Sequence, residues 1–514
     1  MAITIHLIVR YRELAGLNPN MDQRQLVLDS TIFMARPCTF AVLTTVVGFG
    51  SLVLSGILPV MNFGWMMSAG IGVSLFLTFL IFPVLLILMP KAMPNTSFES
   101  RFALTKIFAD ITERHGKTIM FLSVAALMLS IVGASKLNVE NSFIDYFKES
   151  TEIYQGMKVI DQQLGGTTPL DLVVELDESV EETLPVKKDT KPEAELEDEE
   201  EFDSFEEEFE ETASEAQYWF TAEKMEKIER IHDYLNGLEQ TGKVLSLGTM
   251  LKIGKTLNSG KSLDSFLLAL LYNELPERFR KIILDPYVSI ENNEARFYVR
   301  IRDSEPNLRR NELLLQIQHD LKTKLDIPEE KVHLANLLVL YNNMLQSLFK
   351  SQILTLGVVI ISFLIMFIFL FRSITIALIA IFPNVLSIGV VLGFMGWMGI
   401  PLDMMTITIA AISVGIAVDN TIHYIHRFRH EFAIDRNYLA AMHRSHESIG
   451  YAMYYTSITI IIGFSILVLS KFIPSIYFGL LTGLAMLIAL MAALTLLPQL
   501  LIFLKPLGTE KQEV

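Results

Sequence analysis

The stretch "SVGIAVDNTIHYIHRFRHE" (residues 413–431) passes from apolar to charged residues and places an aspartate, Asp419, near the change. If its apolar part crosses a membrane, that aspartate lies in or near hydrocarbon. A charged aspartate at the centre of a membrane helix costs about 2.5–3.5 kcal/mol on insertion scales, so such residues are rare and usually functional. The rest of the chain decides whether this setting applies.

Long apolar runs recur along the chain. Of its 514 residues, 51% are hydrophobic, and the mean hydropathy is +0.41. A run of about 20 apolar residues can cross a bilayer core of roughly 30 Å as a helix. Eight such runs are present, at residues 37–57, 61–89, 117–136, 351–371, 374–398, 403–425, 450–470 and 475–504. The sequence therefore predicts a polytopic α-helical membrane protein with about eight spans.

The basic residues indicate how these spans are oriented. They gather in 90–117, at Arg372 and in 426–448, which fall on one side if the spans alternate. Excess positive charge marks the cytoplasmic side. The long segment 138–350 then faces outward. Because Cys38 is the only cysteine in the sequence, this segment must fold without an intramolecular disulfide.

The net charge of −15 comes from one segment. Residues 175–211 hold 19 acidic and 3 basic residues, a balance of −16 that leaves about +1 for the rest of the chain. We therefore expect no nucleic-acid partner. The insert 175–217 has too few apolar residues to offset the entropy of ordering, so we predict that it is disordered. A role in binding calcium or a cationic partner is conceivable, but no ligand spacing is recognisable.

An internal repeat relates the two ends of the chain. "TIHLIVRYRE" (4–13) aligns with "TIHYIHRFRH" (421–430), and "GFGSLVLSGILPVMNFG" (48–64) aligns with "GFSILVLSKFIPSIYFG" (463–479). Each copy consists of a helix end, a polar connector and two spans. Parallel repeats with binding or coupling sites at their interface are typical of secondary transporters.

Several motifs resemble the resistance-nodulation-division (RND) superfamily, in the branch of MMPL-type lipid exporters, hopanoid transporters and Patched-like proteins. They are Gly415 and Asp419 in the opening stretch, "TSITIIIGFSILVLS" (456–470), "ALTLLPQLL" (493–501) and "ENSFIDYFKESTEIYQGMKVIDQQLGG" (140–166). The family plan has two halves of six spans, each with a periplasmic domain after its first span. The resemblance implies that this chain lacks most of the first half.

The resemblance also implies a domain plan for a bacterial inner-membrane protein. The expected parts are the tail of the first repeat, with a helix stub, a connector helix and two spans (1–90), a cytoplasmic linker (91–116), a span (117–136), a periplasmic domain (137–350), a five-span bundle similar to a sterol-sensing domain (351–505) and a cytoplasmic tail (506–514).

The outward segment combines strand and helix patterns. Residues 169–177 and 296–303 alternate apolar and polar side chains, as half-buried strands do, and 331–338 follows as a third strand. Residues 222–239 and 309–325 have helical spacing. The order of elements predicts an α/β domain of the ferredoxin-like kind. Residues 262–284 form one or two amphipathic helices, which pack on this domain or present an apolar face to lipid.

Asp419 is the candidate proton-relay residue, since the family resemblance falls on it. The supporting candidates are Gly415, Asn420, His423, Asn384, Thr456 and Ser457. Gly415 allows close approach of a neighbouring helix, one turn before the aspartate. The polar members of this set can donate hydrogen bonds. The alternative is an aspartate near the interface that only caps a helix or reaches toward water.

The first copy of the repeat carries no matching acid, because Ala2 falls on Asp419. His6 falls on His423 and has no acid near it in the sequence. We therefore interpret both histidines as structural residues at the membrane edge. Arg427 and Arg429, matched by Arg10 and Arg12, are interpreted as positive-inside anchors.

The sequence shows no nucleophile elbow, P-loop or metal-spaced His/Cys cluster, so we expect neither an enzyme nor a cofactor or metal site. The leading function is a proton-driven permease that exports hydrophobic or lipid-like molecules, with membrane lipids as its surroundings. The alternative is a non-transporting sensor, or a half-transporter that needs the missing first-half chain or a homo-oligomer.

Overall fold

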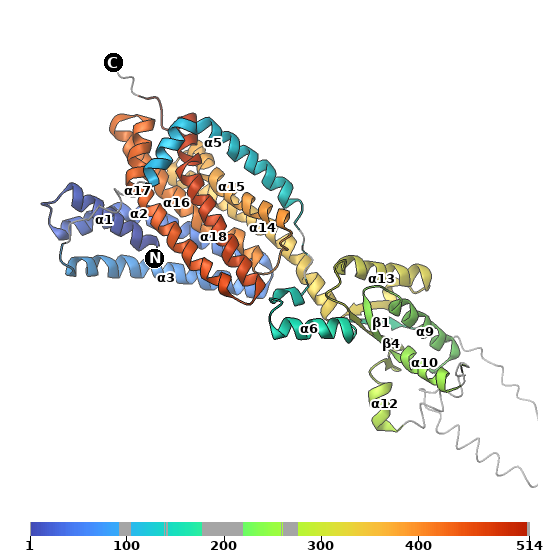
Figure 1. The fold of residues 1–514 in the computed structure, drawn as a ribbon. Coiled ribbons are helices and arrows are strands. Elements are labelled where there is room, and N and C mark those ends of the chain that lie inside the picture. The colour runs from blue at the N-terminus through green and yellow to red at the C-terminus, as the bar shows by residue number, and fades with distance from the viewer. Residues whose placement is uncertain are drawn as a thin grey trace, which may run out of the picture. The chain divides into compact units, whose positions relative to one another are not determined.

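The computed structural model describes residues 2–91, 104–137, 139, 142–176, 219–258, 260 and 276–510. The chain folds into two compact units (Figure 1). The helical unit comprises Met1–Asn141, Tyr146–Lys148 and Met344–Val514, and the α/β unit comprises Ser142–Asp145 and Glu149–Asn343.

Eight helices of the described chain are long and apolar enough to cross a membrane, which confirms the predicted fold class. These candidate spans are Gln23–Ser55, Leu58–Leu88, Thr105–Ala134, Leu337–Phe371, Ile374–Met398, Thr406–Asp435, Tyr438–Leu469 and Ile473–Leu504. A shorter helix, α1 (Ala2–Leu17), precedes them. Most of these helices extend past the predicted apolar runs into polar residues.

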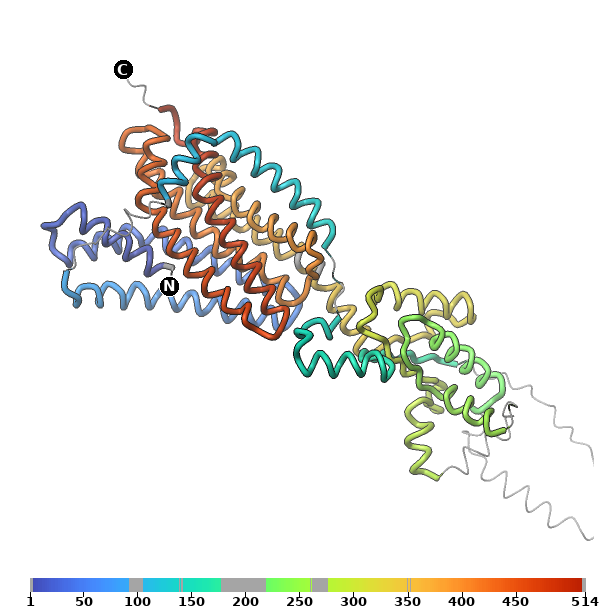
Figure 2. The backbone as a smooth tube through the Cα atoms, in the orientation of Figure 1, coloured from blue at the N-terminus to red at the C-terminus, as the bar shows by residue number. Residues whose placement is uncertain are grey.

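Helix α16 (Thr406–Asp435) is central in the helical unit. It packs against α2 (Gln23–Gly50), α15 (Ile374–Met398), α17 (Tyr438–Ser465) and α18 (Ile473–Leu494). Of its most apolar stretch 89% is buried, whereas that of α3 (Leu58–Leu88) has none buried. Figure 2 shows the early helices, in blue, beside the late ones, in orange and red. Polar side chains on α16 are therefore enclosed by protein.

The two repeat copies adopt the same local structure. In each, a long helix passes into a short 3-10 helix, Ser51–Ser55 or Ile466–Leu469, and the next helix carries a proline in its first turn. A β-carbon on Gly64 would lie 2.6 Å from the carbonyl oxygen of Phe49, and one on Gly479 would lie 2.5 Å from that of Phe464. Equivalent glycines thus permit equivalent close contacts, which supports the repeat found in the sequence.

The segment before the third span differs from its prediction as a linker. Helix α5 (Leu104–Ala134) already begins at Leu104, and it is kinked at His115, whose backbone is non-helical. Residues 92–103 lie outside the described residues. The described second half of the expected linker is therefore helical.

The α/β unit contains a sheet with strand order β2-β4-β1-β5, with β3 also paired to β4 and all pairs antiparallel. Its strands are β1 (Thr168–Glu175), β2 (Thr241–Leu245), β3 (Val288–Ser289), β4 (Glu294–Ile301) and β5 (Val332–Ala335). With α9 (Ala222–Asn236) and α13 (Arg310–Lys324) the order is β-α-β-β-α-β, the ferredoxin-like motif. The predicted motif is confirmed, although the strands predicted from the sequence did not include β2 and β3, which are short.

The register places one apolar face of this sheet against the helices. Leu172 on β1 pairs with Phe297 on β4, and both side chains are fully buried, with Ile228 of α9 and Ile317 of α13 in the same cluster. Three further helices belong to the unit: α6 (Glu152–Gln163), α10 (Leu247–Leu257) and α12 (Glu277–Ile283).

Two predictions fall largely outside the described residues. Residues 177–218 cover nearly all of the predicted disordered insert 175–217, and 261–275 cover the first part of 262–284. The described end of 262–284 contains α12, which buries none of its residues.

Candidate functional site

Asp419 lies near the middle of α16, where a neighbouring helix approaches closely. A β-carbon on Gly48 of α2 would lie 2.9 Å from the Cα atom of Gly415, so position 48 needs the smallest residue, whereas a β-carbon on Gly415 would meet only ordinary contacts at 3.6 Å. Thr45 of α2 donates a hydrogen bond to the carbonyl oxygen of Gly415 at 2.9 Å. The two helices, which belong to different repeat copies, are therefore in backbone contact one turn before Asp419.

Two histidines meet at the Asp419 carboxylate. Nε2 of His423 lies 3.0 Å from Oδ1 of Asp419, and Nε2 of His6 lies 3.8 Å from Oδ2. The imidazole rings of His6 and His423 stack, with centroids 3.9 Å apart and planes 13° apart. His6 is 1% exposed and His423 is 3% exposed. We call these three residues the triad.

The triad corrects one premise of the interpretation of the two histidines. His423 is buried and lies against Asp419. His6 does have an acid nearby, although that acid is far away in the sequence. The signal was present in the repeat, because residues at equivalent positions can meet where the two copies face each other.

The triad retains unused hydrogen-bonding capacity. Neither ring nitrogen of His6 has a hydrogen-bond partner among the described residues. Oδ1 of Asp419 is close to His423 but also lacks a partner of acceptable geometry within that part of the chain. Buried polar atoms are normally paired, and exceptions often mark sites where protons or ligands are exchanged.

The other supporting candidates lie on α16 or beside it but contact different atoms. Asn384 donates to Thr421 at 3.1 Å, and Asn420 donates to Ser457 at 3.1 Å. Thr456 donates to the backbone of its own helix. Among the described residues, no hydrogen bond joins these side chains to Asp419. They tie α16 to α15 and α17 instead.

The triad also has the residue types of a metal site, which the sequence did not suggest because His6 is remote. Its three potential ligand atoms lie within 4.8 Å of one another. However, an imidazole binds a metal in its ring plane at about 2.0–2.1 Å. The two stacked rings have no common in-plane point at that distance, so one ring would have to turn.

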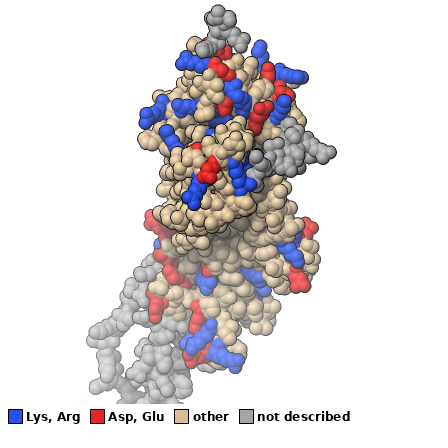
Figure 3. Space-filling model, turned by 90° about the vertical axis from the view of Figure 1, so that its left-hand side faces the viewer, with Lys and Arg blue, Asp and Glu red and all other residues tan. Residues whose placement is uncertain are grey.

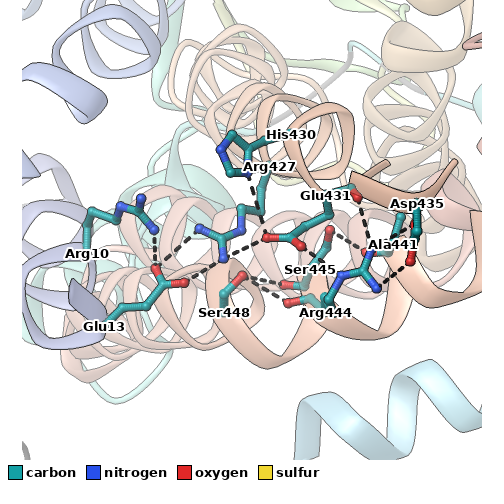
Figure 4. Close-up of polar contacts among 10 residues, drawn as sticks. All are labelled: Arg10, Glu13, Arg427, His430, Glu431, Asp435, Ala441, Arg444, Ser445 and Ser448. Atoms are coloured by element: carbon teal, nitrogen blue, oxygen red, sulfur yellow. Dashed lines mark hydrogen bonds and ion pairs between the residues drawn. The ribbon is translucent and has the colours of Figure 1, made fainter. Parts of the chain in front are cut away.

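A chain of ion pairs lies one to three turns beyond the triad on α16 (Figure 4). Arg427 of α16 binds Glu13 of α1 through two contacts, Nη2 to Oε1 at 2.5 Å and Nη1 to Oε2 at 3.3 Å. Arg10 also binds Glu13, at 2.7 Å. Arg427 and Arg444 both bind Glu431, each at 2.8 Å. Arg427 was expected only to anchor the helix at the membrane surface, yet it joins the two repeat copies.

Comparison with known protein families shows which family the chain belongs to. A profile of the MMPL family matches residues 222–511. The chain belongs to the MMPL family. Over 153 residues it is 30% identical to "Putative membrane protein MJ1562" of Methanocaldococcus jannaschii, covering 30% of this chain and 39% of that protein.

Solved structures show a similar fold. The hedgehog release protein Disp from the water bear Hypsibius dujardini aligns with a TM-score of 0.58 and 13% identity, over 98% of this chain and 62% of that one. SecDF, a translocon-associated membrane protein from Thermus thermophilus, aligns with a TM-score of 0.49 and 12% identity, over 98% and 54%. This MMPL-family chain thus spans less than two thirds of the proteins it matches.

Proposed function

We propose that this MMPL-family protein is a proton-driven permease of a bacterial inner membrane, with its α/β unit in the periplasm, and that it exports hydrophobic or lipid-like molecules. The observation that carries the proposal is the triad. A carboxylate that is only 15% exposed lies beside two buried histidines, one from each repeat copy, so its proton content acts directly on the contact between the copies.

The charge of the triad changes with each proton. One proton shared among an ionised Asp419 and two imidazoles gives a net charge of zero, whereas a second proton leaves a net positive charge. If Asp419 stays ionised, the two protons make both stacked imidazoles cationic. Two such charges repel each other by about 4 kcal/mol at 4 Å with an effective dielectric constant of 20. Their centroids are 3.9 Å apart. A bias of this size is enough to shift a two-state equilibrium several-hundred-fold.

The mechanical consequence follows from where the histidines lie. His6 belongs to α1, and His423 belongs to α16. Repulsion between them would separate the helices, and loss of a proton would let them stack again. The substrate class rests on the family resemblance.

A second candidate is a component that works only with a partner chain or as a homo-oligomer. The observation that favours it is exposed apolar surface, because the most apolar stretch of α3 has no buried residue in this chain. Reconstitution of the purified chain alone distinguishes the candidates. Protein-dependent movement of a fluorescent fatty acid in response to an imposed pH gradient would exclude the need for a different partner chain, but not for a homo-oligomer.

The proton-relay function is tested by Asp419→Asn, measured in inside-out membrane vesicles from the protein's own cells with the same probe. Activity should fall to background while expression and thermal stability persist, since an amide keeps the shape and removes the proton site. His6→Gln and His423→Gln should each lower activity at least tenfold. Full activity in Asp419→Asn would rule out the relay.

A buried aspartate at the start of α16 provides the matched control. Asp403 accepts backbone hydrogen bonds from Met405 at 2.8 Å and Thr406 at 2.7 Å, as an N-terminal cap does. Asparagine caps a helix about as well as aspartate. Asp403→Asn should therefore keep its activity, and an equal loss in both variants would point to a general structural effect.

A further inference from the structure

Two cavities lie in line between the protein surface and the triad. The outer cavity has a volume of about 410 Å³, and its lining includes Arg12, Glu431, Arg444 and Tyr451. The inner cavity has about 20 Å³ and is lined by both histidines of the triad. Val9, Glu13, Arg427 and Ser448 line both cavities. The two cavities thus adjoin at these shared side chains.

The Glu13–Arg427 ion pair is the strongest contact among the shared residues. It is bidentate, and the side chains are 22% and 12% exposed. Charge-assisted bidentate pairs are the stronger and more directional hydrogen-bonded contacts. We call Glu13 and Arg427 the gate pair.

The outer cavity lies at the charged end of the helical unit. Figure 3 shows basic and acidic side chains gathered at one end of this unit, next to a band with few charges. The cavity lining contains three arginines and three glutamates, at residues 12, 427 and 444 and at residues 13, 431 and 447. A polar lining of this kind admits water. By the distribution of basic residues, this end is the expected cytoplasmic end.

We infer that the two cavities form the route by which protons pass between the triad and the cytoplasmic side, and that the gate pair closes this route. The inference rests on the proposed function of the triad. A cavity of about 20 Å³ can hold one water molecule, which needs two to four polar partners. His6 and Glu13 both line it, so one water can bridge the unpartnered imidazole to the gate carboxylate.

The gate pair and the triad belong to the same helix contact. His6 and Glu13 lie two turns apart on α1, and His423 and Arg427 lie one turn apart on α16. A displacement of α1 that unstacks the histidines therefore also stretches the bidentate pair. The route opens when the triad changes its proton content.

Other charged groups surround the gate pair and set its local field. From α1 these are Arg10 and Arg12, from α16 His426, His430 and Glu431, and from α17 Arg444 and Glu447. Of these, Arg10 and Glu431 contact the gate pair directly. Removal of one member of the pair leaves the other with these neighbours, so the helices stay charged but lose their direct link.

The test measures access to the inner cavity and not transport. Cys38→Ala removes the only native thiol, and Ile449→Cys places a reporter that lines the inner cavity alone. A membrane-impermeant, positively charged thiol reagent is applied to inside-out and right-side-out vesicles. With the gate pair intact, modification should be slow. Glu13→Gln should accelerate it at least tenfold, and only in inside-out vesicles.

Two further variants sharpen the result. Arg427→Lys keeps the charge but loses the bidentate geometry, so it should give an intermediate rate. Lys505→Gln removes an ion pair with Glu510, and neither residue lines either cavity, so it should leave the rate unchanged. Each variant is first checked for wild-type expression and thermal stability.

Rapid modification of the intact protein, no acceleration by Glu13→Gln, or modification from the opposite side would overturn the route. The outcome is separable from that of the proposed function. If Asp419→Asn retains transport while the labelling follows the expected pattern, the relay fails and the route stands as a water-accessible passage.

Discussion

Replacing Arg310 by alanine should loosen the α/β unit much more than an ordinary surface charge would. Arg310 and Asp303 form an ion pair in which each side chain is 2% exposed. Asp303 also accepts hydrogen bonds from Ser142 Oγ and from the backbone N–H of Phe143, both at 2.8 Å. The pair thus fastens the segment that enters this unit to the end of β4.

The magnitude follows from burial. Breaking a buried ion pair by removing one partner costs about 3–5 kcal/mol, because an uncompensated charge remains. The two hydrogen bonds left on Asp303 partly compensate its charge, so we expect Arg310→Ala to destabilise the α/β unit by about 3 kcal/mol. Asp303→Asn should fall nearer the upper end, since Ser142, Phe143 and Arg310 all lose a charged acceptor.

Hydrogen exchange of peptides from β1 and β4, followed by mass spectrometry, reports the opening of this unit. A loss of about 3 kcal/mol should speed exchange by about 100-fold or more. Lys281→Ala is the control, because its pair with Glu277 has side chains 65% and 70% exposed. Such a pair contributes about 0.3–0.5 kcal/mol. A similar effect of both variants would refute the role of burial.

Two other predictions concern the glycines of the repeat and the loss of thermal stability at acid pH. Gly64→Ala and Gly479→Ala should each destabilise the protein by about 1–3 kcal/mol through overpacking against a backbone oxygen, whereas Gly70→Ala, with nothing within 4 Å, should be neutral or stabilising in thermal unfolding. Burial raises the pKa of Asp161, but hydrogen bonds from Ser304, Thr167 and the backbone outweigh it, so the pKa lies below 3.8. Its stabilisation is therefore present above about pH 4 and lost as the pH falls below that; thermal midpoints measured from pH 7 to pH 3 should drop less in Asp161→Asn.

The elements of the fold could be predicted because they depend on local pattern. Apolar runs of membrane length and alternating strands act within windows of about 20 residues, and the repeat gave the relation between the two ends. The same reasoning failed at β2, whose five residues include a glycine and a lysine and show no clear alternation. Short edge strands depend on pairing with a neighbour more than on their own sequence.

The candidate site was only half predictable. Asp419 could be found from its unusual setting, but its partner His6 could not, because the contact depends on how α1 is rotated and placed against α16. The same holds for Glu13 and Arg427, which are 414 residues apart in the chain. From the sequence alone, a histidine or arginine at the end of an apolar run is explained simply as a residue at the membrane edge. Only the packing of the two copies shows its contact with a distant acid.

The repeat explains why residues of the same type meet at this contact. The acids stand at positions where the two copies differ. His6 and His423 are equivalent positions that stack, and Arg10 and Arg427 are equivalent positions that both bind Glu13. The acids break the equivalence, because Asp419 corresponds to Ala2 and Glu13 corresponds to His430. Each copy thus supplies one carboxylate at a different depth. In the proposed route a proton passes between an acid of one copy and an acid of the other, so its passage depends on how the two copies contact each other.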